Sequence, residues 1–177
     1  MFDVMRKNHL QTAVVMLSVA LIAAVYLLLV ARFTMQQNDG HVGALLDDTW
    51  IHVRFASHIS DGKGLSYNEG ELTTGATSPL WVLLLAIPYA IFNPSIMTQV
   101  DIAIVMSAIM HIVSVLAITG FGWWATRQAW VGFAAGLIPA LTGRYIWVGL
   151  SGMEITTFTT LCLLSIWSHM HDVHERI

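Results

Sequence analysis

"LQTAVVMLSVALIAAVYLLLVA", residues Leu10–Ala31, is an apolar run without a single charged side chain. A helix needs about 20 such residues to cross a bilayer, so this stretch predicts a membrane-spanning helix. Arg6 and Lys7 precede the run, and by the positive-inside rule they favour a cytoplasmic N-terminus. The apolar core of a cleaved signal peptide is shorter, about 7–15 residues, so we expect this first span to be retained.

The composition of the whole chain points the same way. Of its 177 residues, 56% are hydrophobic and only 11% are charged, whereas soluble domains carry about 25% charged residues. A polytopic membrane protein is therefore predicted, with the lipid bilayer as its surroundings. The formal net charge of −3 is too small to indicate a nucleic-acid partner. The single cysteine, Cys162, cannot form an internal disulfide.

Four further apolar runs follow the first span. Gln99–Gly122 is long enough to cross the membrane, whereas Pro79–Phe92 is short. Ala129–Leu141 and Ile155–Trp167 complete the set. We therefore expect an all-α, polytopic transmembrane bundle that forms a single membrane domain over residues 1–177. Its expected location is the inner (plasma) membrane, which it crosses several times.

Two topologies are compatible with these runs. If Pro79–Phe92 crosses fully, Tyr145–Trp167 becomes one span with Glu154 deep inside it. An ionised carboxylate near the bilayer centre costs about 2.5–3.5 kcal/mol on insertion scales. If the short segment only dips into the outer leaflet, Gly152, Met153 and Glu154 lie at the outer surface. We favour this second arrangement because of Glu154.

A polar loop, residues 32–78, separates the first two apolar runs and holds most of the acidic residues. Within this extracytoplasmic loop, Asp48–Ile59 has the pattern of an amphipathic helix. Ile51, Phe55 and Ile59 recur every fourth residue and would share one apolar stripe. We expect this juxtamembrane helix to lie along the membrane surface.

Local signals mark where the elements of this loop begin and end. Gly62 and Gly64 follow the amphipathic stretch and are typical of a helix stop. Asn68-Glu69-Gly70 predicts a turn. Ser78-Pro79 resembles a helix N-cap followed by proline at the first helical position, so the next helix should begin there.

The adjacent aspartates Asp47 and Asp48 have two explanations. An aspartate at a helix N-cap accepts backbone hydrogen bonds and interacts favourably with the helix dipole. Capping accounts for only one of two neighbouring carboxylates, so catalysis or ligand binding is the alternative. Asp48 and His52 are four residues apart, as are Arg54 and His58, and each pair can meet on a helical face.

The order of residues in this loop resembles the N-terminal module of the GT-C membrane glycosyltransferases, in particular bacterial members of the arabinofuranosyltransferase and protein-mannosyltransferase-like group. The resemblance covers about residues 1–95. "SGME", Ser151–Glu154, is a second and shorter likeness, at the start of a later helix. The matching loop residues are Asp47, Asp48, Arg54, Gly62, Gly64, Tyr67, Asn68, Gly75, Thr77, Ser78, Pro79, Leu80 and Trp81.

This resemblance implies a transferase at the outer membrane face. It would take a sugar from a polyprenyl-phosphate-linked donor and attach it to a hydroxyl of a glycan, lipid or protein acceptor. Asp47 would act as general base on that hydroxyl, with Asp48 as its partner, and cationic side chains would neutralise the phosphate. The substrate-binding residues so implied are His52, Arg54, Lys63, Tyr67, Asn68 and Glu154.

The resemblance leaves the metal requirement open. Some GT-C enzymes use a divalent cation and others need none. Asp47, Asp48 and Glu154 supply oxygen ligands suited to Mg²⁺ or Mn²⁺, and Asp48 is the candidate ligand.

The length of the chain bears on its activity. GT-C enzymes are usually several times longer, so we expect this chain to be the N-terminal part of such a module. A non-catalytic membrane subunit or a truncated remnant is the alternative. A transporter module is less favoured, because the ionisable residues concentrate in one loop rather than along several spans.

Overall fold

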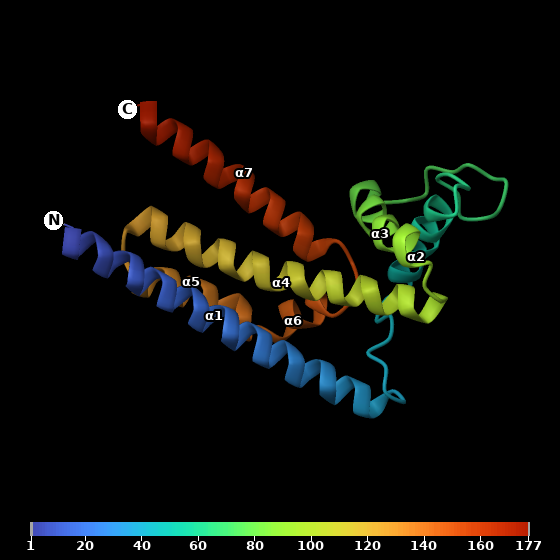
Figure 1. Ribbon diagram of the computed structural model, residues 1–177, viewed down its shortest axis with the longest axis horizontal. Coiled ribbons are helices and arrows are strands. Elements are labelled where there is room, and N and C mark those ends of the chain that lie inside the picture. The colour runs from blue at the N-terminus through green and yellow to red at the C-terminus, as the bar shows by residue number, and fades with distance from the viewer. Residues whose placement is uncertain (1, 177) are drawn as a thin grey trace. The chain divides into compact units, whose positions relative to one another are not determined.

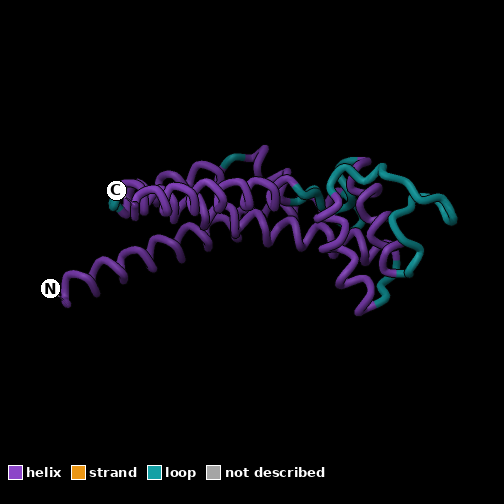
Figure 2. The backbone as a smooth tube through the Cα atoms, turned by 90° about the horizontal axis from the view of Figure 1, so that it is seen from above, coloured by secondary structure: helices purple, strands orange, loops and turns teal. Residues whose placement is uncertain are grey.

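A computed structural model describes the backbone of residues 2–176 and the side chains of residues 10–173. Helices joined by loops make up the chain (Figure 1), and no strand occurs among these residues (Figure 2). The predicted all-α class is thus confirmed. The helices are α1 (Phe2–Gln37), α2 (Asp47–Ser60), α3 (Pro79–Phe92), α4 (Ile96–Thr126), α5 (Ala129–Leu141), α6 (Gly143–Gly149) and α7 (Ile155–Arg176).

Two of these helices are long and apolar enough to cross a membrane. They are the Leu10–Gln37 part of α1 and all of α4, Ile96–Thr126. α5 and α6 pass the same test only together, and they are bent by 70° at the break between them. The described part of the chain therefore contains two to three helices able to span a bilayer. Their apolar character indicates a membrane-associated protein.

The structure differs from one helix that the first topology assumed. Tyr145–Trp167 is not one helix, because α6 ends at Gly149 and α7 begins at Ile155. Glu154 lies in the turn between these helices rather than within a span. The energetic objection to a buried carboxylate in mid-helix therefore does not arise.

The chain divides into two compact units. The first unit comprises Met1–Val30, Met110–Ile146 and Thr156–Ile177, and the second unit comprises Ala31–Ile109 and Trp147–Ile155. The second unit thus contains α2, α3 and the turn that precedes α7.

Glycines on α5 allow a close approach to α4 in the first unit. A Cβ atom added at Gly132 would lie 2.7 Å from the backbone oxygen of Thr119, and one at Gly136 would overlap the Thr119 side chain. Glycines four residues apart commonly mark helix contacts in membranes, where packing rather than the hydrophobic effect drives association. The buried core of this unit consists of Val19, Ala23, Val115 and Ala140, with Phe133 and Tyr145 packed against it.

In the second unit α2 packs on α3 (Figure 1). The start of α4 is joined to both helices by hydrogen bonds. The Tyr89 hydroxyl donates to the Gln99 backbone oxygen at 2.7 Å, and Gln99 Nε2 donates to Ser57 Oγ at 3.3 Å. The buried apolar side chains here include Val53, Phe55, Ala56, Trp81, Val82 and Leu85.

The buried face of α2 differs from the predicted apolar stripe. Ile51 and Ile59 are only half-buried, and Phe55 alone of the three predicted residues is fully buried. Contacts with α3 and with the turn before α7 determine which face of α2 is buried. The periodicity of a single helix carries no information about these partners. The buried residues of α2 are Thr49, His52, Val53, Phe55, Ala56 and His58.

The predicted helix boundaries in this region are confirmed. Gly62 follows α2 with a φ of +74°, and the Lys63 amide donates to the His58 oxygen at 2.8 Å, as expected for a glycine helix stop. Ser78 occupies the N-cap position of α3, and Pro79 is its first residue.

Candidate functional site

The paired aspartates form the first turn of α2. The helix begins at Asp47, Leu46 occupies the N-cap position, and no side chain of the described residues caps this end. Capping therefore does not explain either aspartate. Both carboxylates are exposed and lie at the positive end of the helix dipole, where negative charge is favoured.

The exposed face of α2 carries both a negative and a positive side chain. Asp47, Trp50 and Arg54 are exposed, and their spacing of three and four residues places them on one helical face. Two turns of helix, about 10 Å, separate Asp47 from Arg54 along the axis. A carboxylate and a guanidinium therefore face the same side, with an indole between them.

His52 lies on the opposite, buried side of α2 and is only 1% exposed. Its Nε2 atom is 3.2 Å from the Thr77 hydroxyl, just before α3. Its Nδ1 atom is 3.5 Å from a carboxylate oxygen of Glu154. This second contact is within ion-pair distance but does not have hydrogen-bond geometry, and among the described residues neither atom has another hydrogen-bond partner.

The "SGME" turn is held against α2 and α3 by two buried hydrogen bonds. The Thr49 hydroxyl donates to the Ser151 oxygen at 2.7 Å, and the Trp81 indole donates to the Gly152 oxygen at 3.1 Å. Gly152 has a φ of +76°, and a Cβ atom there would lie 2.9 Å from the Thr49 methyl group. Both the backbone conformation and the space therefore require glycine.

Burial makes the His52 imidazole harder to protonate than the imidazole of a solvated histidine. Burial lowers its pKa, and the carboxylates of Glu154 and, more weakly, Asp48 oppose that shift. Two acidic side chains from different parts of the sequence thus act on the pKa of His52. Its protonation state depends on both.

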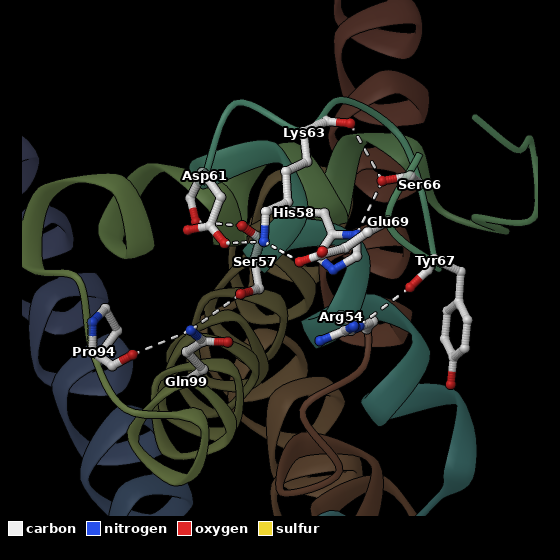
Figure 3. Close-up of polar contacts among 11 residues, drawn as sticks. Arg54, Ser57, His58, Asp61, Lys63, Ser66, Tyr67, Glu69, Pro94 and Gln99 are labelled. Atoms are coloured by element: carbon white, nitrogen blue, oxygen red, sulfur yellow. Dashed lines mark hydrogen bonds and ion pairs between the residues drawn. The ribbon is translucent and has the colours of Figure 1, made fainter. Parts of the chain in front are cut away.

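Most of the remaining predicted residues form a separate polar cluster in the loop after α2 (Figure 3). Lys63 Nζ lies 2.6 Å from Glu69 and 3.3 Å from Asp61. These contacts raise the pKa of Lys63, and the Lys63 contact lowers that of Glu69. Arg54 Nε donates to the Tyr67 backbone oxygen at 3.2 Å. The cluster therefore shapes the loop that covers one side of α2.

Further hydrogen bonds fix the same loop. His58 Nδ1 is 3.0 Å from the Ser66 hydroxyl in a buried contact, and Asn68 Nδ2 donates to Glu71 at 3.3 Å. The Glu71 amide donates to the Asn68 oxygen, so the predicted turn is present. Arg54 and His58, which spacing alone allowed to pair, thus bond to different loop residues.

A pocket opens beside α2 and this loop. Its volume is about 290 Å³, and the rings of Phe55 and Tyr67, with centroids 5.9 Å apart, form part of its wall. Ligand pockets are typically apolar with a few polar groups, and this one has that character. The pocket is lined by Ile51, Phe55, Tyr67, Thr73 and Gly75.

No group of three or more histidine, cysteine or acidic residues within the described part of the chain is arranged to hold a metal ion. Asp47, Asp48 and Glu154 thus do not form a ready three-residue metal centre. Metal binding by Asp48 stays a prediction.

Three residues of the site were missed by reasoning from the sequence. Thr49, Thr77 and Ser151 make contacts that hold the site together; Thr77 and Ser151 belonged to the quoted motifs without a role of their own, and Thr49 carried no signal. No family model, curated protein or solved structure matches the chain. The family resemblance therefore rests on the motif residues themselves.

Proposed function

We propose that the chain has the function of a GT-C-type glycosyltransferase of the inner (plasma) membrane, with its N-terminus in the cytoplasm. It moves a sugar from a polyprenyl-phosphate-linked donor to an acceptor hydroxyl at the outer face. One observation carries the proposal. The two stretches that separately resemble this family, residues 47–81 and "SGME" at 151–154, are in contact in the second unit.

The chemistry assigned to Asp47 is general-base catalysis. The acceptor oxygen bonds to the anomeric carbon while the bond from that carbon to the phosphate oxygen breaks. The lipid phosphate leaves with the electron pair, and the hydroxyl proton passes to Asp47. Its exposed position in the first turn of α2 leaves the carboxylate accessible to an acceptor, with Asp48 as its neighbour.

Arg54 is the best-placed cation for the departing phosphate. Lys63 is already held by two carboxylates, and His52 is buried. Arg54 is exposed on the same face of α2 as Asp47, and its Nε atom donates to the Tyr67 oxygen. Guanidinium groups bind phosphate through paired donors.

The neighbouring pocket supports a donor with an apolar portion. Ile51 and Phe55 contribute apolar surface, and the Tyr67 ring is 44% exposed at the wall. Aromatic walls of this kind receive either a sugar ring or a lipid chain. Trp50, 40% exposed on the same helix, offers a second aromatic surface.

The substitution Asp47→Asn tests the function. In membrane vesicles containing the intact protein and a labelled polyprenyl-phosphate sugar, we expect transfer to fall by about 10²–10⁴-fold, the usual contribution of a general base. Asp39→Asn removes the same charge from an exposed residue outside the site and should leave transfer unchanged. Turnover retained in Asp47→Asn would contradict the role of Asp47.

The same assay separates the alternative function. If the parent protein inserts normally but transfers no sugar from mannose- or arabinose-bearing donors, a non-catalytic membrane subunit becomes the better conclusion. Insertion is checked by the protein's resistance to alkaline extraction from the membrane.

A further inference from the structure

Glu154, His52 and Thr77 connect a carboxylate, a buried imidazole and an exposed hydroxyl. The carboxylate is 3.5 Å from Nδ1, and the hydroxyl is 3.2 Å from Nε2. His52 is only 1% exposed, whereas Thr77 is exposed and Glu154 is 23% exposed. The buried imidazole therefore links two residues that are both partly open to solvent.

The negative charge of Glu154, 3.5 Å from Nδ1, favours one tautomer of His52 even though this contact lacks hydrogen-bond geometry. Glu154 can only accept a hydrogen bond when ionised, and the second nitrogen of an imidazole takes the role that the first leaves to it. The positive end of an N–H bond at Nδ1 is attracted by the charge of the carboxylate, whereas a lone pair at Nδ1 would be repelled by it. Nε2 then carries the lone pair and accepts a hydrogen bond from the Thr77 hydroxyl.

This direction of hydrogen bonding determines what Thr77 offers outward. A hydroxyl has one proton and two lone pairs, and here the proton points inward to His52. Only lone pairs remain for a ligand, so Thr77 can accept a hydrogen bond from a ligand hydroxyl but cannot donate one to a phosphate oxygen.

We infer that Thr77 is a binding residue for a sugar or acceptor hydroxyl, held in accepting orientation by His52 and Glu154 as positioning residues. This inference rests on the proposed function and adds to it a residue outside the aspartate pair. The shared chemistry is an aliphatic hydroxyl, which can belong to the sugar of the donor or to the acceptor.

Nitrogen-15 NMR of the His52 ring tests the orientation without any transfer reaction. The chain, labelled at its eight histidines, is held in lipid nanodiscs at a pH where His52 is neutral, and His52→Gln identifies the signal. We expect the proton on Nδ1. Glu154→Leu, which removes the accepting oxygen, should move it towards Nε2. A proton on Nε2 in the parent chain would overturn the inference, because Thr77 would then donate outward.

Binding and kinetics test the ligand. The probes are a short-chain polyprenyl-phosphate mannose as donor and octyl mannoside as acceptor. Thr77→Val should weaken binding of one of them about tenfold, the size of a single hydrogen bond, and Thr77→Ser should restore it to within about twofold. Thr74→Val, an exposed threonine of the same loop, is the matched control and should change neither.

The two probes identify the source of the hydroxyl. A weaker donor Kd in Thr77→Val assigns the hydroxyl to the donor sugar, and a raised KM for octyl mannoside alone assigns it to the acceptor. An unchanged Kd and KM would overturn the inference. If the parent chain binds neither probe, the proposed function fails, while a proton on Nδ1 in that sample would still support Thr77 as an outward-facing acceptor.

Discussion

The contact between α4 and α5 in the first unit and the contact of the "SGME" turn with α2 and α3 in the second both use glycine, but only the second adds buried hydrogen bonds between the elements. The first is close because Gly132 and Gly136 lack side chains. The second is close because buried donors on Thr49 and Trp81 find backbone oxygens. Close packing through small residues suits a helix pair among lipids, whereas directed hydrogen bonds fix the orientation of a site.

Gly136→Ala should break the first contact and have the largest effect. Its Cβ would overlap the Thr119 side chain and meet Val19 at 3.0 Å, so the helices must separate. Overpacking of this kind costs about 3 kcal/mol, measured as the free energy of unfolding in mixed detergent micelles.

Gly143→Ala is the matched control. No described atom lies within 4 Å of a Cβ placed there, and alanine is the better helix former, so stability should be unchanged or slightly higher. Equal effects of the two alanines would contradict the close packing of α5 on α4.

Gly152→Ala should break the second contact with a smaller effect. The φ of +76° and the 2.9 Å approach to Thr49 both oppose a side chain, so we expect a loss of about 2 kcal/mol. Gly70→Ala provides the comparison, because Gly70 has a similar φ of +83° without a described atom within 4 Å. The difference between the two losses measures the contact with Thr49. Equal losses would mean that backbone strain alone accounts for the effect.

The smallest expected effect concerns the charge balance at His52. Glu154→Gln should lower the pKa of His52 further, and Asp48→Asn should lower it less, because Glu154 opposes the effect of burial more strongly than Asp48 does. An NMR titration of the ring measures both. The reverse order would contradict the contact with Glu154.

The same shift makes stability depend on pH. The folded pKa of His52 lies below its ordinary value of about 6.5, so the unfolded chain binds more protons between the two values. The contribution of His52 to the unfolding free energy is therefore full above about pH 6.5 and is lost as the pH falls through the folded pKa. His52→Gln should remove this dependence.

Much of the helical framework could be predicted from the sequence. The apolar run Leu10–Ala31 and the signals around Gly62 and Ser78-Pro79 depend on near neighbours, and α1, the end of α2 and the start of α3 agree with them. Local chemistry was sufficient for these features. The family resemblance of residues 47–81 and 151–154 is a different kind of inference, and the function it implies stays a prediction.

The inner side of the site could not be predicted, because it depends on contacts between distant residues. Thr49 and Ser151 are 102 positions apart, and nothing local to either indicates the other. The periodicity of α2 assigned Ile51 to the buried face, whereas the structure buries His52. Polar residues can form a buried face when another element supplies their hydrogen-bond partners. The sequence of one helix does not reveal that other element.

The turn at Asn68–Gly70 has a practical consequence for locating this loop in a cell. Glu69 is 70% exposed, and no described atom crowds the position above Gly70. Exposed turn tips of this kind tolerate inserted peptides. An epitope tag placed there would leave His52, Thr77 and Glu154 undisturbed, and antibody binding to intact spheroplasts would report directly which side of the membrane the aspartates face.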